Sequence, residues 1–350
     1  MQHVRVNRGE LLRFATDTFA ALGMSRPDAE TAAEVLVWAN ERGIDSHGVM
    51  RIPVYLAEMK TGEYKPTGQP VTRQLLPATF ILDCNRAPGP VCMMRAAARA
   101  MELAETFGIA IGLVSDPTHV GAIGRYAQHV AERGHAALVI VAGLPLMAYH
   151  GASVASIATA PIAIAVPAAT PETRPVLLDM ATSFIPFGRI QQAAAEGEPI
   201  PEGVALDAEG EPTTDATQAT TLLPVGGAKG SGLSLMFECL TGILAGTPIV
   251  ARRGRGAEAP RQNAMIVVFN VASFRPPNDY RNDIQELAEF VKGLPRREGF
   301  DELLLPGERG NREAELRRRT GIPLPGWLWT ELNTIGRELG VAPLELWERQ

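Results

Sequence analysis

Three side chains with complementary chemistry, His47, Arg51 and Tyr55, stand four residues apart in a segment that the sequence predicts to be helical. This spacing places side chains on one face of a helix, with Cβ atoms about 5–6 Å apart. An arginine can bind a carboxylate through two parallel hydrogen bonds, and a histidine can exchange a proton near neutral pH. The row therefore fits a site for a small carboxylate. From spacing alone, a solvated helix face with a hydrogen-bonded histidine is the alternative.

A second histidine, His119, lies in the polar turn 116–121 between a predicted strand and a predicted helix. α/β proteins place ligands at the carboxyl ends of strands, and the N-terminus of the following helix favours anions. The turn is therefore a candidate ligand site, and a capping loop with an incidental histidine is the alternative.

Two further segments could bind an anionic group. The glycine-rich stretch 226–232 contains Lys229 and precedes an apolar helical segment, so its backbone can approach a phosphate. It is not a P-loop, because no Gly-Lys-[Ser/Thr] ends it, and a flexible turn is the alternative. Asp179 follows another predicted strand, where a carboxylate can orient a histidine, meet a ribose hydroxyl or cap a helix. These residues alone indicate an anion-binding α/β enzyme.

The elements that must position these residues follow from hydrophobic periodicity and from their caps. Ser25 is a predicted helix N-cap, and Gly43 and Gly62 are predicted helix stops. The middle of the chain is βαβ-like, and the whole predicts an α/β protein with helical additions at both ends, divided into two or three lobes. Helices are expected over 8–42, 49–60, 91–107, 121–133, 232–245 and from 278 onward, and strands over 76–84, 109–115, 136–142, 162–167, 176–180 and 264–271.

The bulk composition argues against several classes of protein. A net charge of −6 disfavours a nucleic-acid partner, and the basic cluster Arg252, Arg253 and Arg255 stands among glycines and is expected to be a solvated loop. The three cysteines form no CxxC pair, which suits a reducing compartment and gives little support to a metal site. The longest apolar stretch, 136–148, is too short to span a bilayer, and the N-terminus lacks the apolar core of a secretion signal. We therefore expect a cytoplasmic protein without a metal or a membrane partner.

Taken together and in their order, these segments resemble the malate/L-lactate/ureidoglycolate dehydrogenase family. That family also includes sulfolactate dehydrogenases, diketogulonate reductase and Δ1-piperideine-2-carboxylate reductase. The resemblance covers nearly the whole chain, and the combination of short motifs is specific. The matching pieces are Arg42-Gly43-Ile44-Asp45-Ser46-His47-Gly48 with Arg51 and Tyr55, His119-Val120-Gly121, Pro161-Ile162-Ala163 with Pro167, Asp179-Met180-Ala181-Thr182-Ser183, Asp207 to Asp215, Leu223-Pro224 through Lys229-Gly230, and Leu305-Pro306-Gly307-Glu308.

The resemblance implies a non-Rossmann α/β fold that binds NAD(H) or NADP(H), usually as a homodimer with sites near the interface. It implies a helical substrate and dimerisation lobe of residues 1–115 with 300–350, and a dinucleotide-binding lobe with a mixed sheet over 116–299. The implied reaction is hydride transfer between nicotinamide and a small 2-hydroxy or 2-keto acid. Reduction of cyclic or N-alkyl 2-imino acids is the alternative, and a catalytically inactive binding protein is the less favoured one.

The resemblance also implies roles for single residues. His47 is the acid/base that serves the substrate oxygen or nitrogen, and in some members the residues matching Ser46 and Asp179 are its relay partners. In other members the residue matching His119 has the proton role. Arg51 and Tyr55 match substrate-binding positions. The implied cofactor contacts are His119, Asp179, Met180, Thr182, Ser183, Lys229, Gly230, Gly307 and Glu308.

The sequence departs from the family pattern at four places that are expected to line the pocket. Small polar groups are lost there, while the protonic and anionic groups remain, so we expect the pocket to suit a bulkier or less polar acid than malate. Thr118 replaces Asn, Val141-Ala142-Gly143 replaces Thr-Asn-Ser, Ala158-Thr159-Ala160-Pro161 replaces Gly-Thr-Asn-Pro, and Tyr149-His150-Gly151-Ala152 replaces Pro-x-Gly-Gly.

Overall fold

The computed structural model describes residues 3–170, 173–248, 250 and 262–347 of the 350-residue chain. The basic cluster Arg252, Arg253 and Arg255 lies outside the described residues, so its predicted loop is not tested.

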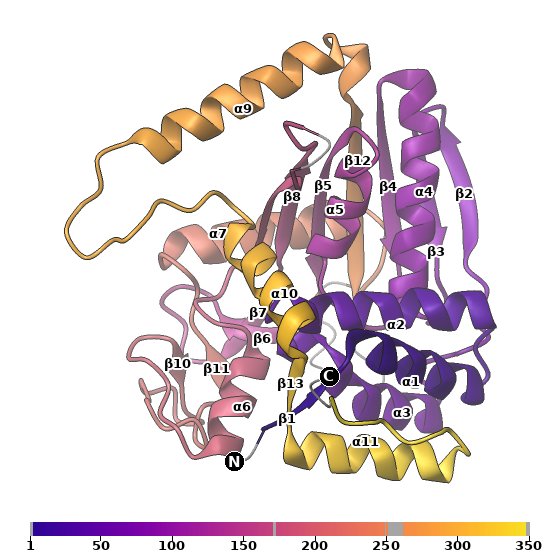
Figure 1. The fold of residues 1–350 in the computed structure, drawn as a ribbon, viewed down its shortest axis with the longest axis vertical. Coiled ribbons are helices and arrows are strands. Elements are labelled where there is room, and N and C mark those ends of the chain that lie inside the picture. The colour runs from indigo at the N-terminus through magenta and orange to yellow at the C-terminus, as the bar shows by residue number, and fades with distance from the viewer. Residues whose placement is uncertain (1–2, 171–172, 249, 251–261, 348–350) are drawn as a thin grey trace.

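A seven-stranded mixed sheet occupies the upper part of the molecule in Figure 1, in the order β2-β3-β4-β12-β5-β8-β9. The predicted α/β class with a mixed sheet is confirmed. The predicted βαβ unit over 109–142 is modified, because β12 lies between β4 and β5 and pairs antiparallel with both. The strands are β2 (Val71–Leu76), β3 (Thr79–Asp83), β4 (Ile109–Ser115), β5 (His135–Ala142), β8 (Ile162–Val166), β9 (Val176–Met180) and β12 (Asn263–Asn270).

Helices cover both faces of this sheet. On one face, α4 (Gly89–Phe107) and α5 (Gly124–Ala131) share an apolar core with alternate side chains of the strands. On the other face, α7 (Ala228–Glu238) and the π-helical turn η3 (Cys239–Ile243) lie over the sheet, and Phe237 is buried against it. Because both faces are buried, the central strands are apolar on both sides.

The two ends of the chain form a mostly helical part with its own apolar core, below the sheet in Figure 1. The Ser25 side chain accepts a hydrogen bond from the Asp28 N–H, which confirms the predicted N-cap. A left-handed Gly62 ends the third helix, as predicted. The elements are β1 (His3–Val6), α1 (Arg8–Ala21), α2 (Arg26–Glu41), α3 (Ile52–Thr61), β13 (Ile322–Pro325), which pairs with β1, and α11 (Gly326–Glu338).

The division into lobes 1–115 with 300–350 and 116–299 stays a prediction. The strands β2, β3 and β4 and the helix α4 fall in its first lobe by number, yet they pair or pack with the seven-stranded sheet. A lobe boundary near residue 115 would therefore divide the strands of one sheet between two lobes.

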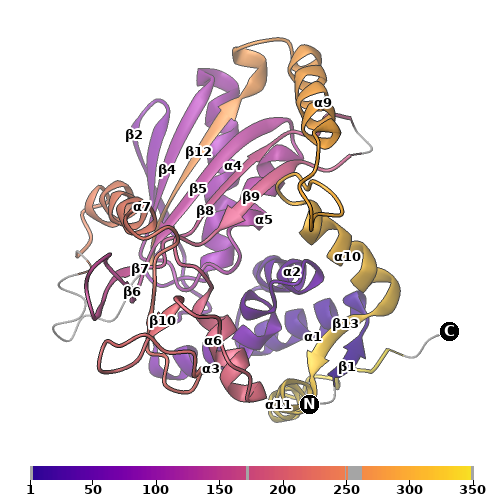
Figure 2. The same ribbon diagram turned by 90° about the vertical axis from the view of Figure 1, so that its left-hand side faces the viewer.

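A small sheet in the order β10-β11-β6-β7 packs with a helix, α6, beside the main sheet (Figure 2). The sequence pattern predicted none of these elements. The four strands have only two to four residues and are too short to show alternation. The elements are β6 (Pro145–Ala148), β7 (Ala155–Ala158), α6 (Phe187–Glu196), β10 (Ala205–Leu206) and β11 (Thr221–Leu222).

The predicted helical tail is confirmed by α9 (Pro277–Gly293), α10 (Glu308–Thr320) and α11. α9 extends away from the body as an arm, and the chain then returns so that α10 crosses α2 (Figures 1 and 2). Among the described helices, none is both long and apolar enough to cross a bilayer.

Candidate active site

The segment that carries His47 is a broken helix. Extended backbone at Gly48 (φ −87°, ψ −154°) separates two 3₁₀ turns, η1 (Asp45–His47) and η2 (Val49–Arg51), and η2 leads into α3. The single helix face predicted for His47, Arg51 and Tyr55 is therefore not formed. The Asn40 side chain packs against this break. A Cβ at position 48 would lie only 2.2 Å from the Asn40 side-chain oxygen, so the position needs glycine.

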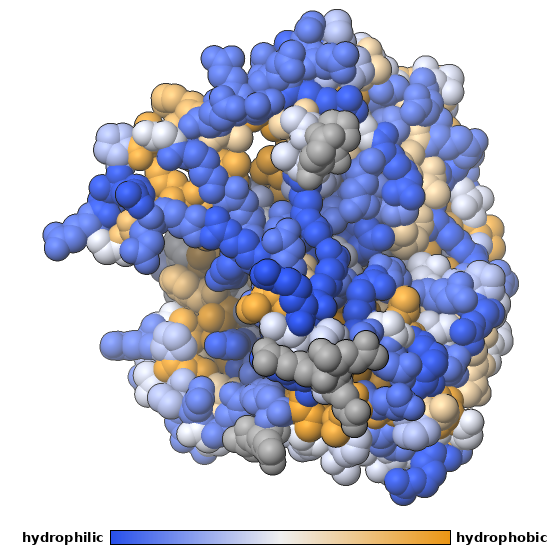
Figure 3. Space-filling model, viewed as in Figure 1, coloured by the Kyte–Doolittle hydropathy of each residue, from blue (hydrophilic) through white to orange (hydrophobic). Residues whose placement is uncertain are grey.

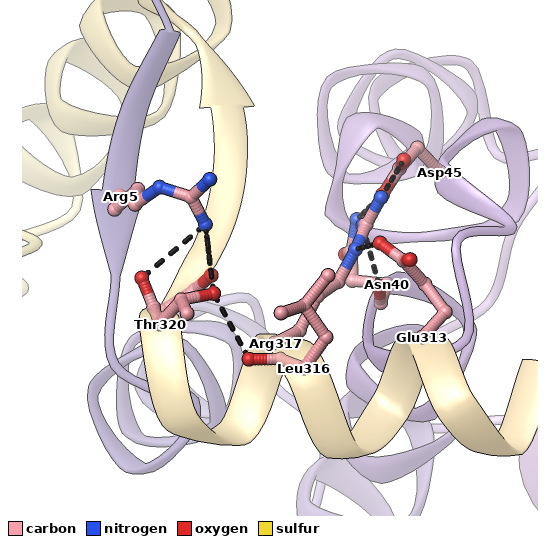
Figure 4. A network of polar contacts seen from close by, with 8 residues as sticks. Arg5, Asn40, Asp45, Glu313, Leu316, Arg317 and Thr320 are labelled. Atoms are coloured by element: carbon pink, nitrogen blue, oxygen red, sulfur yellow. Dashed lines mark hydrogen bonds and ion pairs between the residues drawn. The ribbon is translucent and has the colours of Figure 1, made fainter.

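The first of these turns is fixed by a buried arginine from the far end of the chain (Figure 4). Arg317 of α10 donates to both carboxylate oxygens of Asp45, at 2.7 and 3.0 Å, and to the Asn40 carbonyl oxygen at 2.6 Å. The Asn40 side chain donates to Asp45 at 2.7 Å and accepts from the Val49 N–H at 2.8 Å. Glu313 accepts from Arg317 Nε at 2.5 Å. These bonds set the backbone on both sides of His47.

The His47 ring lies between a hydroxyl and a second histidine. Ser46 Oγ is 2.9 Å from His47 Nδ1, and the ring centroids of His47 and His119 are 5.5 Å apart. Burial, and next the positive charge of Arg51, lower the pKa of His47 to about 4. The ring is therefore neutral at pH 7, and Nε2 is the nitrogen that Ser46 leaves available.

His119 is held in one tautomer by its neighbours. Its Nδ1 accepts a hydrogen bond from the Gly121 N–H at 3.3 Å, and the Tyr55 hydroxyl is 2.7 Å from the same nitrogen. A backbone N–H can only donate, so Nδ1 carries no proton and the ring proton is on Nε2. Burial, followed by the charges of Arg51 and His47, keeps the pKa of His119 well below its usual value. His119 is thus a neutral donor rather than a base.

Arg51 presents one edge of its guanidinium to the protein and leaves the other edge available. Its Nε donates to the Ser46 carbonyl oxygen at 2.7 Å, which fixes the plane of the group. Among the described residues, no hydrogen bond or ion pair engages its two terminal nitrogens. Its charge lowers the pKa of both His47 and His119, so it lies in the same electrostatic environment as the two rings.

Asp179 lies at the end of β9, where the sequence predicted a strand-end carboxylate. It accepts a hydrogen bond from the Gly124 N–H at the start of α5 at 3.1 Å. Burial raises its pKa to about 6, although the Gly124 hydrogen bond and Arg42 act in the opposite direction. Within the described part of the chain, no hydrogen bond joins Asp179 to Ser46 or His47, so its relay role stays a prediction.

The predicted cofactor segments 179–183 and 226–232 come together. The Thr182 carbonyl oxygen accepts from the Val225 N–H at 2.8 Å, and Ser183 forms a bridge with Pro224. A Cβ at Gly230 would lie 2.5 Å from the Thr182 carbonyl oxygen, so glycine allows the two segments to touch. Met180 ends β9 beside them.

The start of α7 in this loop is open to a ligand. The positive φ angles of Gly226 and Gly227, 60° and 59°, turn the chain into the helix, and no side chain caps it. Lys229 is exposed in the first turn. The N–H groups of Lys229 and Gly230 already donate to the Gly226 and Val225 carbonyl oxygens, so among the described residues the Ala228 N–H and the Lys229 ammonium are the donors left for a phosphate group.

Gly307 and Glu308 lie at the start of α10, next to β9. Gly307 has a φ of 90°, and a Cβ there would meet the Leu177 carbonyl oxygen at 3.0 Å. Glu308 accepts from the Leu305 N–H at 2.9 Å and forms an ion pair with Lys292. Both residues thus have structural contacts, and their predicted cofactor contacts stay a prediction.

Two neighbours of the site were missed by sequence reasoning. Gly188 of α6 packs against Ser46, since a Cβ there would lie 2.5 Å from Ser46 Cβ. The His150 ring lies against Gly227, 3.0 Å from the position of an added Cβ. The only sequence signal for His150 was its place in one of the four departures from the family pattern. The described residues contain no group of three His, Cys, Asp or Glu side chains that could hold a metal ion.

Comparison with known proteins gives a consistent family. The family model described as malate/L-lactate dehydrogenase matches residues 6–333. Malate dehydrogenase of Pyrococcus abyssi is 32% identical over 356 residues, covering 98% of this chain and 97% of the relative. Sulfolactate dehydrogenase of Methanocaldococcus jannaschii has a TM-score of 0.87 at 29% identity, covering 96% of this chain and 98% of that one. Δ1-Piperideine-2-carboxylate reductase of Pseudomonas syringae pvar. tomato has a TM-score of 0.81 at 27% identity, covering 96% and 100%.

Proposed function

The chain belongs to the malate/L-lactate dehydrogenase family, and from that premise we propose that it transfers a hydride between NAD(H) or NADP(H) and a small 2-hydroxy or 2-keto acid. Membership makes it an oxidoreductase of the dehydrogenase class. The proposal adds the nicotinamide cofactor, the keto-acid substrate and the residues that handle them.

The observation that carries the proposal is the free edge of Arg51. Its Nε is committed to the Ser46 carbonyl oxygen, while its two terminal nitrogens have no partner among the described residues. Those nitrogens match a carboxylate in spacing and charge. An arginine fixed beside two neutral histidines therefore supports a substrate whose carboxylate is adjacent to a reacting oxygen.

The two histidines have different roles in this proposal. His119 Nε2–H is a fixed donor that polarises the substrate oxygen, because its Nδ1 is occupied by Gly121 and Tyr55. His47 exchanges a proton with that oxygen through Nε2, and Ser46 Oγ supports Nδ1. Binding of a carboxylate to Arg51 offsets the charge that lowers the pKa of His47, so the ring accepts a proton more readily when substrate is bound.

The residues at the start of α7 fit the cofactor. The helix start provides the Ala228 N–H, which has no partner among the described residues, and Lys229 provides a positive charge. Gly230 allows close backbone approach. A dinucleotide bound there would supply or accept the hydride. The polypeptide would hold its phosphates at 227–230, while Asp179, Thr182 and Ser183 shape the adjoining turn.

Reduction of a cyclic or N-alkyl 2-imino acid is the second candidate. It uses the same residues, with nitrogen in place of the substrate oxygen. One solved relative is named as a piperideine-2-carboxylate reductase. The buried Ala160 and the glycine at 143, which replace polar family residues, also favour a less polar substrate than malate.

We also propose that the protein is a homodimer. α9 has no buried residue, and Leu287 and Phe290 on it are 59% and 64% exposed. A second apolar face follows α7 and η3, and Figure 3 shows apolar surface on the arm and in the recess beneath it. Such faces are larger than isolated exposed side chains and mark protein interfaces. The exposed residues of the second face are Leu233, Leu235, Met236, Leu240, Ile243 and Leu244.

The experiment is a screen for oxidation of NADH and of NADPH with 2-keto acids, with the same keto acids plus methylamine, and with a cyclic 2-imino acid. We expect turnover with at least one carboxylate and much slower turnover with its amide. Turnover only with the amine or the cyclic compound would select the imino-acid function. Cofactor binding without turnover across the panel would contradict both.

A further inference from the structure

A small cavity of about 130 Å³ lies where α2, α5 and α10 converge, and its lining includes none of the residues that bond His47 and His119. Figure 1 shows α10 crossing α2 at this place, with α5 beside them. The volume is well below the roughly 300–1,000 Å³ of pockets that enclose drug-sized ligands. The cavity can therefore hold a small ion or a single substituent of a larger molecule.

The lining of the cavity has more positive than negative charges. Five arginines and three glutamates line it. Arg8 pairs with Glu34 at 2.7 Å and with Glu41 at 3.1 Å, and Arg318 pairs with Glu41 at 2.7 Å. The third glutamate, Glu132, is 3.5 Å from Arg125. Among the described residues, the other two arginines, Arg42 and Arg174, form no ion pair with a carboxylate, although Asp179 and Glu41 are close enough to Arg42 to raise its pKa.

Arg42 is the first of these two guanidinium groups, and it is only 8% exposed. Its hydrogen bonds go to neutral oxygens, the Asn311 side chain and the Gly307 carbonyl, and the Trp38 ring lies 5.0 Å from its guanidinium carbon. Burial and the nearby charge of Arg174 lower the pKa of Arg42 to about 10. A buried cation with this environment is stabilised by an added anion.

Arg174 is the second guanidinium group, and the described residues give it no hydrogen bond or ion pair. Arg125 adds an unused donor to the same cavity, because its Nε is buried without a hydrogen-bond partner among the described residues. Donors on guanidinium groups from three separate segments therefore surround one space.

We propose that this cavity binds a phosphate group, as a dianion held by Arg42, Arg125 and Arg174. A dianion matches the two unpaired positive charges, and a tetrahedral oxyanion offers acceptors in several directions to planar guanidinium forks. A monocarboxylate would balance one charge only. The phosphate can come from inorganic phosphate or from a phosphate ester, including the 2′-phosphate of NADP(H).

The test is thermal unfolding of the full-length protein with inorganic phosphate, against chloride at the same ionic strength. A ligand that binds only the folded state raises the melting temperature as its concentration passes the Kd. We expect this rise in the wild type, a loss of most of it in Arg174→Gln and in Arg125→Gln, and an unchanged rise in Arg73→Gln, an exposed arginine of β2.

Three further arms identify the source of the phosphate. Sulfate should reproduce the rise, and acetate should not. If phosphate competes with NADPH but not with NADH, and Arg174→Gln weakens NADPH alone, the cavity holds the 2′-phosphate of the cofactor. If neither cofactor is affected, it holds a free phosphate or another ester. A rise that is equal with chloride, or equal in the wild type and both arginine variants, would overturn the proposal.

Discussion

Tyr55 and Gly121 determine what His119 can do. Because two donors meet at Nδ1, the ring can present only an N–H at Nε2. His47 has a single hydroxyl beside its Nδ1 and can change protonation state. The different roles proposed for these two histidines, whose ring centroids are 5.5 Å apart, therefore rest on their hydrogen-bond partners.

Replacing Tyr55 with phenylalanine tests this division. The variant keeps the ring packing against Phe19 and Tyr64 but removes the hydroxyl at His119 Nδ1. We expect kcat/KM to fall about 10–100-fold, which is the scale seen when a hydrogen bond that orients a metal-bound histidine is lost. ¹⁵N NMR should show a smaller Nε2–H fraction for His119. An unchanged ring spectrum would contradict the role given to Tyr55, and Tyr280→Phe on α9 is the control.

Stability should depend on pH through the same rings. Burial and Arg51 lower the folded-state pKa of His47 to about 4, so between about pH 6.5 and 4 the unfolded chain binds protons that the folded chain does not. The contribution of His47 to the free energy of unfolding should therefore fall as pH falls through this window. Asp179 acts oppositely, because its pKa is raised from 3.8 to about 6 and its contribution is lost as pH rises.

Chemical denaturation of the wild type and His47→Gln measures this effect. The variant should lose less stability than the wild type between pH 6.5 and 4, and the exposed His3→Gln should follow the wild type. Parallel curves for all three proteins would show that His47 takes up its proton equally in the folded and unfolded states.

At the scale of elements, α10 positions the turn that carries His47. Arg317 is about one-tenth exposed and joins Asp45, Asn40 and Glu313 across a sequence separation of up to 277 residues. Since the turn η1 contains only three residues, its own hydrogen bonds cannot fix the direction of His47. The direction of His47 therefore depends on a helix that does not itself carry the histidine.

Arg317→Ala should reduce stability by about 1.5–3 kcal/mol, the range for hydrogen bonds to charged groups, because the Asp45 and Glu313 carboxylates that it leaves behind are more than one-third exposed. We expect kcat to fall and the Kd of the reduced cofactor to change little, because the start of α7 is not part of this network. The neighbouring exposed Arg319→Ala is the matched control. A variant with wild-type kcat would show that His47 does not need this clamp.

Sequence patterns predicted the helices and strands better than they predicted which side chains contact one another. Caps such as Ser25 and stops such as Gly62 act within a few residues, so the helices were predictable. The bonds Tyr55–His119 and Arg317–Asp45 span 64 and 272 residues, and no local periodicity encodes them. The break at Gly48 was missed for the same reason, since its cause is the Asn40 side chain packed against it.

At the scale of the whole molecule, the exposed apolar surfaces predict a dimer. Light scattering should give about twice the 37.5 kDa mass of one chain. A protein with Leu287→Glu and Phe290→Glu should shift toward the monomer, because charges on a buried apolar face are not paired. Glu286→Gln on the same helix should not. A wild-type protein that stays monomeric at micromolar concentration would contradict the dimer.

The proposed reaction requires that Arg51 hold the substrate carboxylate beside the two histidines. The most direct measurement compares kcat/KM for the best 2-keto or 2-imino acid and for its amide, in the wild type and in Arg51→Lys. A lysine cannot form the two parallel hydrogen bonds. In Arg51→Lys, kcat/KM for the acid should therefore fall by an amount equivalent to roughly 2–4 kcal/mol of transition-state stabilisation. The amide should already be poor and should lose little more, with cofactor affinity unchanged. An equal loss for acid and amide would contradict the assignment of Arg51 and the carboxylate substrate with it.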